Sequence, residues 1–154
     1  MCRKLSVTLI IILMFLGFVT SAKAEKERLD NIAACAGVVI GNGAIDFFMG
    51  NEQLFDDAAD VAYSAYLSLV FSSEHSQDDL QVADQILGGN LDKVINAYNS
   101  ETFDNDLYEE IVGCYRVLSL QILSSSETII KNQSSWAEVK NNSVNILKRM
   151  LKAD

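Results

Sequence analysis

The only histidine of this 154-residue chain, His75, lies in a polar turn beside Ser72, Ser73 and Ser76. Acyl transfer by a serine needs a base, an acid that orients the base, and donors that stabilise the oxyanion. The sequence around His75 has neither a nucleophile elbow nor an orienting acid. A lone histidine is also a poor metal site. We therefore predict no catalytic residue, no metal and no cofactor for this chain.

Carboxylates gather at 104–110, which contains Asp104, Asp106, Glu109 and Glu110. Calcium loops use such acids, but they also need a glycine at the turn and a bidentate acid at the twelfth position. This segment has neither of them. Because negative side chains stabilise the first turn of a helix, we interpret the group as the start of a helix.

Cys35 and Cys114 are the two cysteines that follow the apolar N-terminal segment, and Cys2 precedes it. Their separation of 79 positions excludes a CxxC redox motif, a CxxCH haem site and the close spacing of a zinc ribbon. Exported proteins meet an oxidising compartment in which disulfides persist. We therefore predict a Cys35–Cys114 disulfide between two helices. The alternative is a pair of buried thiols that behave as small apolar side chains.

Charge is unevenly distributed along the chain. No Lys or Arg occurs between Arg28 and Lys93, whereas five basic residues follow from Lys131 onward. A solvated acidic surface explains this pattern, and so would a docking surface for a basic partner. Self-association, with the basic last helix meeting the acidic middle of a neighbour, is a third interpretation. The candidate docking residues are Asp56, Asp57, Asp60, Asp78, Asp79 and Asp84.

Small residues follow one another along 33–44, and each glycine inside a helix costs about 1 kcal/mol relative to alanine. Close packing against a neighbouring helix would offset that cost. A kink near 41–43 is one alternative. Another is a groove for an acyl chain or an aromatic ligand, and its candidate residues are Gly37, Gly41, Gly43, Phe47, Phe48 and Phe55.

The absence of proline and the three-and-four spacing of apolar residues predict helices throughout. Gly50 should end the first helix, Ser76 should cap the third, and Ser135 should open the last. We expect Gly88 and Gly89 to end the helix that Ser76 caps, and Asn90 to cap a new short helix. The expected helices lie at about 28–49, 52–71, 77–87, from 90, 104–130 and from 135.

The first 24 residues have the order of a secretory signal. Arg3 and Lys4 provide the charged start, an apolar stretch runs from Leu5 to Val19, and Ala22-Lys23-Ala24 is a small-x-small cleavage pattern. We predict cleavage after Ala24 and a periplasmic or secreted protein without stable membrane insertion. An uncleaved anchor is the alternative, but the stretch is shorter than the roughly 20 residues that a spanning helix needs.

The chain carries 12 basic and 21 acidic residues, a formal net charge of -9, which argues against a nucleic-acid partner. We predict one all-α domain at 25–154, a compact bundle of five or six helices in which the first, second, fourth and last pack together. The expected function is non-enzymatic binding of a protein or a small apolar ligand in the bacterial envelope. A small enzyme, or a carrier of a lipid or aromatic ligand, is the alternative.

Overall fold

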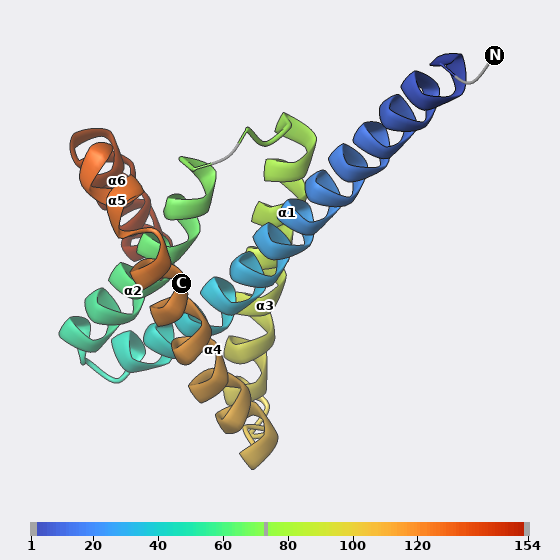
Figure 1. Cartoon of the computed structure of the whole chain (residues 1–154). Coiled ribbons are helices and arrows are strands. Elements are labelled where there is room, and N and C mark those ends of the chain that lie inside the picture. Colours follow the sequence, from blue (N-terminus) through green and yellow to red (C-terminus); the bar gives the residue numbers. More distant parts are fainter. Residues whose placement is uncertain (1–2, 73, 153–154) are drawn as a thin grey trace.

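A computed structural model describes residues 3–72 and 74–152, with side chains from residue 23 onward. This part of the chain forms six helices and no strand, which confirms the all-α class (Figure 1). The helices are α1 (Arg3–Phe48), α2 (Glu52–Val70), α3 (Gln77–Asn99), α4 (Asn105–Ser124), α5 (Ser126–Lys131) and α6 (Gln133–Leu151).

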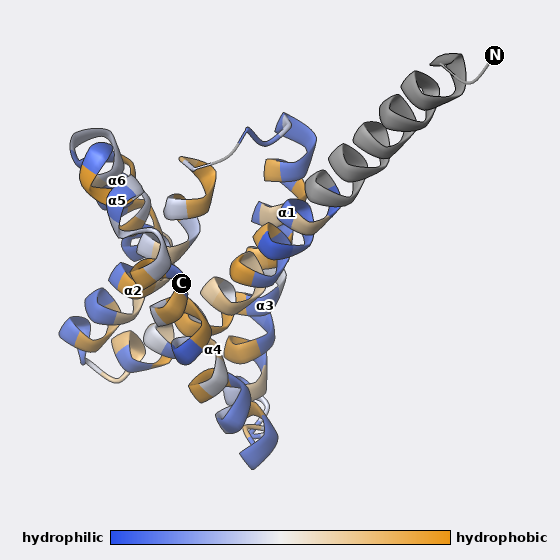
Figure 2. Cartoon of the chain, viewed as in Figure 1, coloured by the Kyte–Doolittle hydropathy of each residue, from blue (hydrophilic) through white to orange (hydrophobic). Residues whose placement is uncertain are grey.

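The C-terminal half of α1 is the central element, and α2, α3 and α4 all pack against it. Its residues Leu29, Ile40 and Val39 are fully buried, as is Phe55 of α2. The hydrophobic sides of α1, α2 and α4 meet at the middle of the molecule, and their polar sides face outward (Figure 2). Burial of an apolar stripe on each helix therefore builds one core.

The partners of α1 differ from the expected ones. The expected bundle excluded the 77–99 region, yet α3 packs along α1 and is its most extensive partner. The last helix, α6, makes its main contacts with α2 and buries no residue fully. The reason is the outer position of α6, whose apolar side chains are half-buried or exposed.

The expected break at Gly88 and Gly89 is wrong, because α3 continues through both glycines. Packing of α3 along α1 outweighs the roughly 1 kcal/mol cost of each glycine. Asn90 is consequently not an N-cap, and its side chain donates to the Ile86 carbonyl inside the helix. The N-cap at Ser76 is confirmed, since its hydroxyl accepts from the Asp79 backbone N–H at 3.1 Å.

Three further helix ends can be compared with expectation. Gly50 lies in the turn that follows the end of α1, as predicted, and has a φ of +87° that glycine adopts without strain. The expected helix over 104–130 is divided at Ser125, whose hydroxyl accepts from the Gln121 side chain at 2.7 Å. The last helix begins at Gln133 without a side-chain cap, so Ser135 is an interior residue and its expected capping role is wrong.

The predicted disulfide is confirmed. Cys35 of α1 and Cys114 of α4 are joined, with their Cα atoms 4.8 Å apart. Cys114 is buried among Leu107, Ile111 and Leu118, which are neighbours on the inner face of α4. The bond therefore fixes the central helix to α4.

The predicted signal segment lies almost entirely in the part of α1 whose side chains are outside the described residues. Among the described residues, 23–48 is the one stretch long and apolar enough to cross a membrane, and 61% of its most apolar window is buried in the fold. Core helices of soluble proteins have the same property. An apolar N-terminal helix together with the disulfide fits an exported protein.

Candidate functional site

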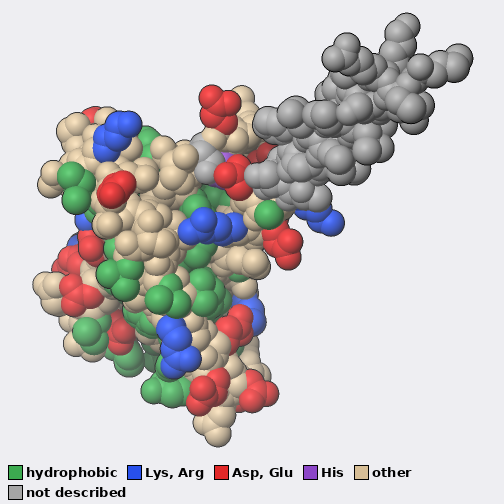
Figure 3. All heavy atoms as spheres, in the orientation of Figure 1, with side chains coloured by type: hydrophobic (Ala, Val, Ile, Leu, Met, Phe, Trp, Pro, Cys, Tyr) green, Lys and Arg blue, Asp and Glu red, His purple; other side chains and the backbone are tan. Residues whose placement is uncertain are grey.

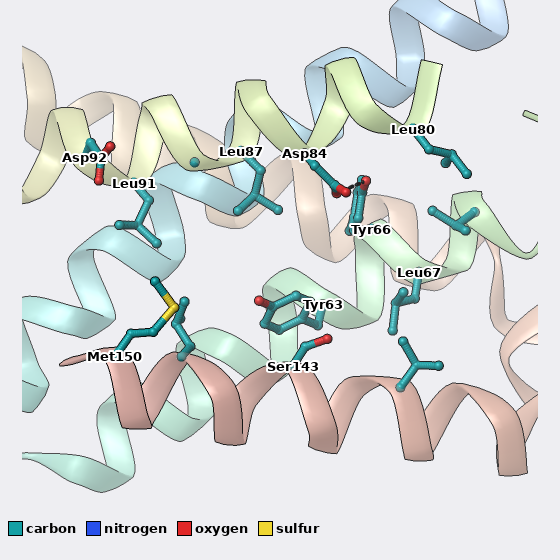
Figure 4. Close-up of a pocket in the computed structure, with 14 residues that line it drawn as sticks. Tyr63, Tyr66, Leu67, Leu80, Asp84, Leu87, Leu91, Asp92, Ser143 and Met150 are labelled. Atoms are coloured by element: carbon teal, nitrogen blue, oxygen red, sulfur yellow. Dashed lines mark hydrogen bonds between the residues drawn. The ribbon is translucent and has the colours of Figure 1, made fainter. Parts of the chain in front are cut away.

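A cleft of about 620 Å³ opens between α2, α3 and α6, and we refer to it as the α3–α6 cleft. It exists because α6 packs on α2 and leaves space between itself and α3. Figure 4 shows α3 and α6 on opposite sides, with Tyr63 and Tyr66 of α2 between them. Most lining side chains are apolar: Leu67, Val70, Leu80, Leu87, Leu91, Val139, Leu147 and Met150.

Helical periodicity places these residues on shared faces. Positions 63, 66, 67 and 70 line one side of α2, and positions 80, 84, 87 and 91 line one side of α3. Positions 139, 143, 147 and 150 do the same on α6. A second face of α2 and of α3 packs in the core. A second face of α6 contacts the acidic side of α2.

The polar centre of the cleft is a hydrogen bond between two helices. The Tyr66 hydroxyl donates to Asp84 Oδ1 at 2.7 Å. Burial, together with this bond to the carboxylate, raises the pKa of Tyr66 far above its usual range. Burial and then the charge of Asp84 also raise the pKa of Tyr63. Both phenols therefore stay protonated at neutral pH, and that of Tyr66 acts as a hydrogen-bond donor.

Gly88 keeps the α3 side of the cleft open. It is half-buried, it lines the cleft, and an added Cβ would have no atom within 4 Å. A larger side chain at this position would consequently extend into empty space. The neighbouring Gly89 is exposed and lies outside the lining. Sequence reasoning interpreted this pair as a helix break and missed its place in the cleft.

Ion pairs hold α6 against α2. Lys140 pairs with Asp60, and Lys148 pairs with Asp56 at 2.5 Å and with Glu52 at 3.3 Å. The bond to Asp56 raises the pKa of Lys148, with Glu52 contributing in the same direction. The basic last helix thus meets acidic residues of its own chain.

The six acids of the predicted docking surface lie on two helices. Asp56 and Asp60 on α2 face the lysines of α6, while Asp57 accepts from Gln53 at 2.9 Å. On α3, Asp79 pairs with Lys26 at 2.6 Å and Asp84 binds Tyr66, as described above. Asp78 is exposed. A docking surface made of all six stays a prediction.

Helices cover the small-residue strip of α1. A Cβ at Gly37 would overlap the carbonyl oxygen of Leu87, and one at Gly41 would lie 2.9 Å from the carbonyl oxygen of Leu91. At Gly43, an added Cβ would lie 2.7 Å from the Cβ of Ala58. The three glycines therefore allow α3 and α2 to approach the backbone of α1.

The three predicted groove phenylalanines are in different environments. The rings of Phe47 and Phe55 have centroids 5.5 Å apart, and Phe55 is fully buried. Phe48 is 49% exposed at the end of α1. None of the three lines the α3–α6 cleft.

His75 and the buried polar residues of the core show no reactive grouping. The His75 Nε2 atom lies 3.3 Å from the Leu69 carbonyl oxygen. No cluster of three His, Cys, Asp or Glu residues that could hold a metal occurs among the residues that were placed. Sequence analysis missed Gln121, which is buried, accepts from Arg28 at 2.7 Å and donates to Ser68 at 3.0 Å.

The front face of the molecule carries exposed apolar side chains on α4 (Figure 3). Val112, Val117, Leu120 and Leu123 are between 38% and 72% exposed. Val117 and Leu120 also line an open hollow of about 680 Å³ between α1 and α4. The α3–α6 cleft is more enclosed, since three helices form its walls, and it has a hydrogen-bonded Tyr66–Asp84 pair at its centre. The cleft therefore has the features of a small-molecule site.

Comparisons of the chain with protein-family models, with curated proteins and with solved structures returned no match.

Proposed function

We propose that this protein is a small exported binding protein of the bacterial envelope, which takes an apolar ligand into the α3–α6 cleft. The observation that carries the proposal is the cleft itself. Its volume of about 620 Å³, its predominantly apolar lining and its few polar groups are typical of ligand pockets. The proposal thus adopts the carrier alternative of the sequence analysis, but for a site other than the glycine strip.

Binding rather than catalysis is supported by the state of the polar groups. Tyr66 is the buried titratable residue of the cleft, and its phenol stays protonated because of its raised pKa. A general acid or base works best with a pKa near the operating pH. The hydrogen bond from Tyr66 to Asp84 suits a fixed recognition group better than a proton-transfer pair.

Export is the second part of the proposal. The signal-like N-terminal segment and the disulfide support a periplasmic or secreted protein that is cleaved after Ala24. Mass spectrometry of the protein from a periplasmic fraction should find a chain that begins at Glu25. A full-length chain in the membrane fraction would contradict this part.

The cleft can be tested with a neutral fluorescent probe, N-phenylnaphthylamine, and two glycine variants. Gly88→Leu should fill the cleft and weaken probe binding at least about tenfold, which corresponds to about 1.4 kcal/mol. Gly89→Leu is the matched control, because it makes the same change one residue away, outside the lining. Both variants remove a helical glycine and should not lose helix stability. Equal binding by the two variants would contradict the proposed site.

A further inference from the structure

The charged residues that line the α3–α6 cleft are all acidic. They are Asp84 and Asp92, and no Lys or Arg belongs to the lining among the described residues. The lysines of α6 are engaged elsewhere, because Lys140 and Lys148 reach the acids of α2. The charge that the lining side chains contribute to the cleft is therefore negative.

Asp84 is held in position to receive a ligand. Figure 4 shows its carboxylate pointing from α3 toward Tyr66, and the 2.7 Å hydrogen bond to Oδ1 fixes its orientation. That bond occupies one acceptor site, and a carboxylate has about four. The remaining sites can accept from an ammonium group.

Tyr63 adds an aromatic face and a free hydroxyl. Its side chain lies between α3 and α6, and it is half-buried (Figure 4). No hydrogen bond joins its hydroxyl to another residue of the described part, although the side chain lines the cleft. Tyrosine rings attract cations through their negative faces. Tyr63 and Asp84 thus offer a cation two kinds of favourable contact.

Resting on the proposed function, we infer that the ligand of the α3–α6 cleft is a small organic cation, an ammonium group carried on an apolar body. The ammonium donates to Asp84 and lies near the tyrosine rings. The apolar body contacts Leu87, Leu91 and Leu147. An anionic ligand of the same shape is disfavoured, because it would bring a negative charge next to Asp84.

The dimensions of the site favour a small molecule over a helix of a partner protein. A helix with its side chains is about 10 Å across. The cleft of about 620 Å³ is bounded by α6, which ion pairs hold in place. A partner helix could bind only after α6 left α2, whereas a small cation fits beside it.

Three ligands with one apolar body separate charge from shape: phenylbutylammonium, phenylbutanol and phenylbutyrate. Calorimetric titration of the purified, oxidised protein should give the tightest binding for the ammonium, about fivefold tighter than the alcohol, and the weakest for the carboxylate. The expected factor is modest because Asp84 is exposed to solvent, which screens its charge.

Asp84→Asn should remove the preference for the ammonium and leave the affinity for phenylbutanol unchanged. Asp78→Asn is the matched control, because it removes the same charge from an exposed position on α3 outside the cleft. Melting curves of both variants establish that they are folded. A preference that persists in Asp84→Asn would overturn the inference.

The remaining outcomes distinguish this inference from the proposed function. If phenylbutanol binds the unmodified protein as tightly as phenylbutylammonium, the cation preference is overturned and the cleft stands as an apolar site. If neither these ligands nor N-phenylnaphthylamine binds, both proposals fall. Tight binding of a basic helical peptide, without binding of phenylbutylammonium, would also overturn the small-cation inference.

Discussion

At the scale of single residues, position 37 requires glycine because the backbone of α3 lies directly against it. A Cβ at this position would overlap the Leu87 carbonyl oxygen and lie 3.0 Å from the Cβ of Asn90. Gly37→Ala should therefore lower the free energy of unfolding by about 2 kcal/mol, since a helix backbone cannot give way as a flexible side chain can. Urea denaturation measures this change.

Gly89→Ala is the control for Gly37→Ala. Gly89 is exposed and a Cβ there would meet no atom within 4 Å. Alanine should stabilise the protein here by up to about 1 kcal/mol through its helix propensity. If both variants were stabilised equally, α3 would not pack on α1 as closely as described.

The ionisation of Tyr66 makes the free energy of unfolding depend on pH in the alkaline range. Its pKa in the folded protein is raised, first by burial and then by its bond to Asp84. The neutral phenol is therefore favoured by the fold, and this contribution is complete below the unfolded-state pKa of about 10. It is lost as the pH rises from there toward the higher folded-state value.

As the pH rises above about 10, the ordinary tyrosine pKa, Tyr66→Phe should consequently lose less stability than the unmodified protein. At neutral pH the variant should be less stable by about 1 kcal/mol, the value of one hydrogen bond. Urea denaturation at several pH values measures both effects. Parallel pH profiles for the two proteins would show that Tyr66 does not contribute to the pH dependence.

At the scale of helices, α6 depends on charge for its position on α2. Lys148 lies between Asp56 and Glu52, and its side chain is 20% exposed. Lys148→Glu would place a third acid there, so α6 amides should exchange hydrogen about fivefold faster, a loss of about 1 kcal/mol. Added salt should weaken the ion pairs in the unmodified protein and act in the same direction.

Arg149→Glu is the matched control for that helix. It introduces the same change of charge at the next position, which is exposed and has no ion pair among the described residues. Hydrogen exchange of α6 should stay unchanged in this variant. Equal acceleration in both variants would show that the total charge, not the pairs with α2, controls the helix.

At the scale of the whole molecule, the disulfide limits how far the chain can unfold. It closes a loop between positions separated by 79 residues. In the chain-entropy description, such a bond stabilises the fold by about 4 kcal/mol. Replacing both Cys35 and Cys114 with alanine should lower the free energy of unfolding by about that amount. Equal urea midpoints for the variant and the oxidised protein would contradict this expectation.

Local sequence determined several features of this protein because their causes lie within a few residues. Ser76 and Asp104 cap helices through bonds to backbone N–H groups three positions later, at 3.1 and 2.9 Å. Gly50 ends a helix through its own φ angle. The pairing of Cys35 with Cys114 was predictable because these are the only two cysteines that follow the apolar N-terminal segment.

Tertiary structure decided the remainder. The sequence indicated a basic last helix and an acidic middle, but only the packing of α6 on α2 brings Lys148 to Asp56 within one chain. The continuous α3 also depends on its packing along α1, which outweighs the glycine cost. The α3–α6 cleft combines Tyr66, Asp84 and Ser143 from three helices. Periodicity assigns each residue to a face of its own helix, whereas the contacts between helices depend on long-range packing that no local spacing encodes.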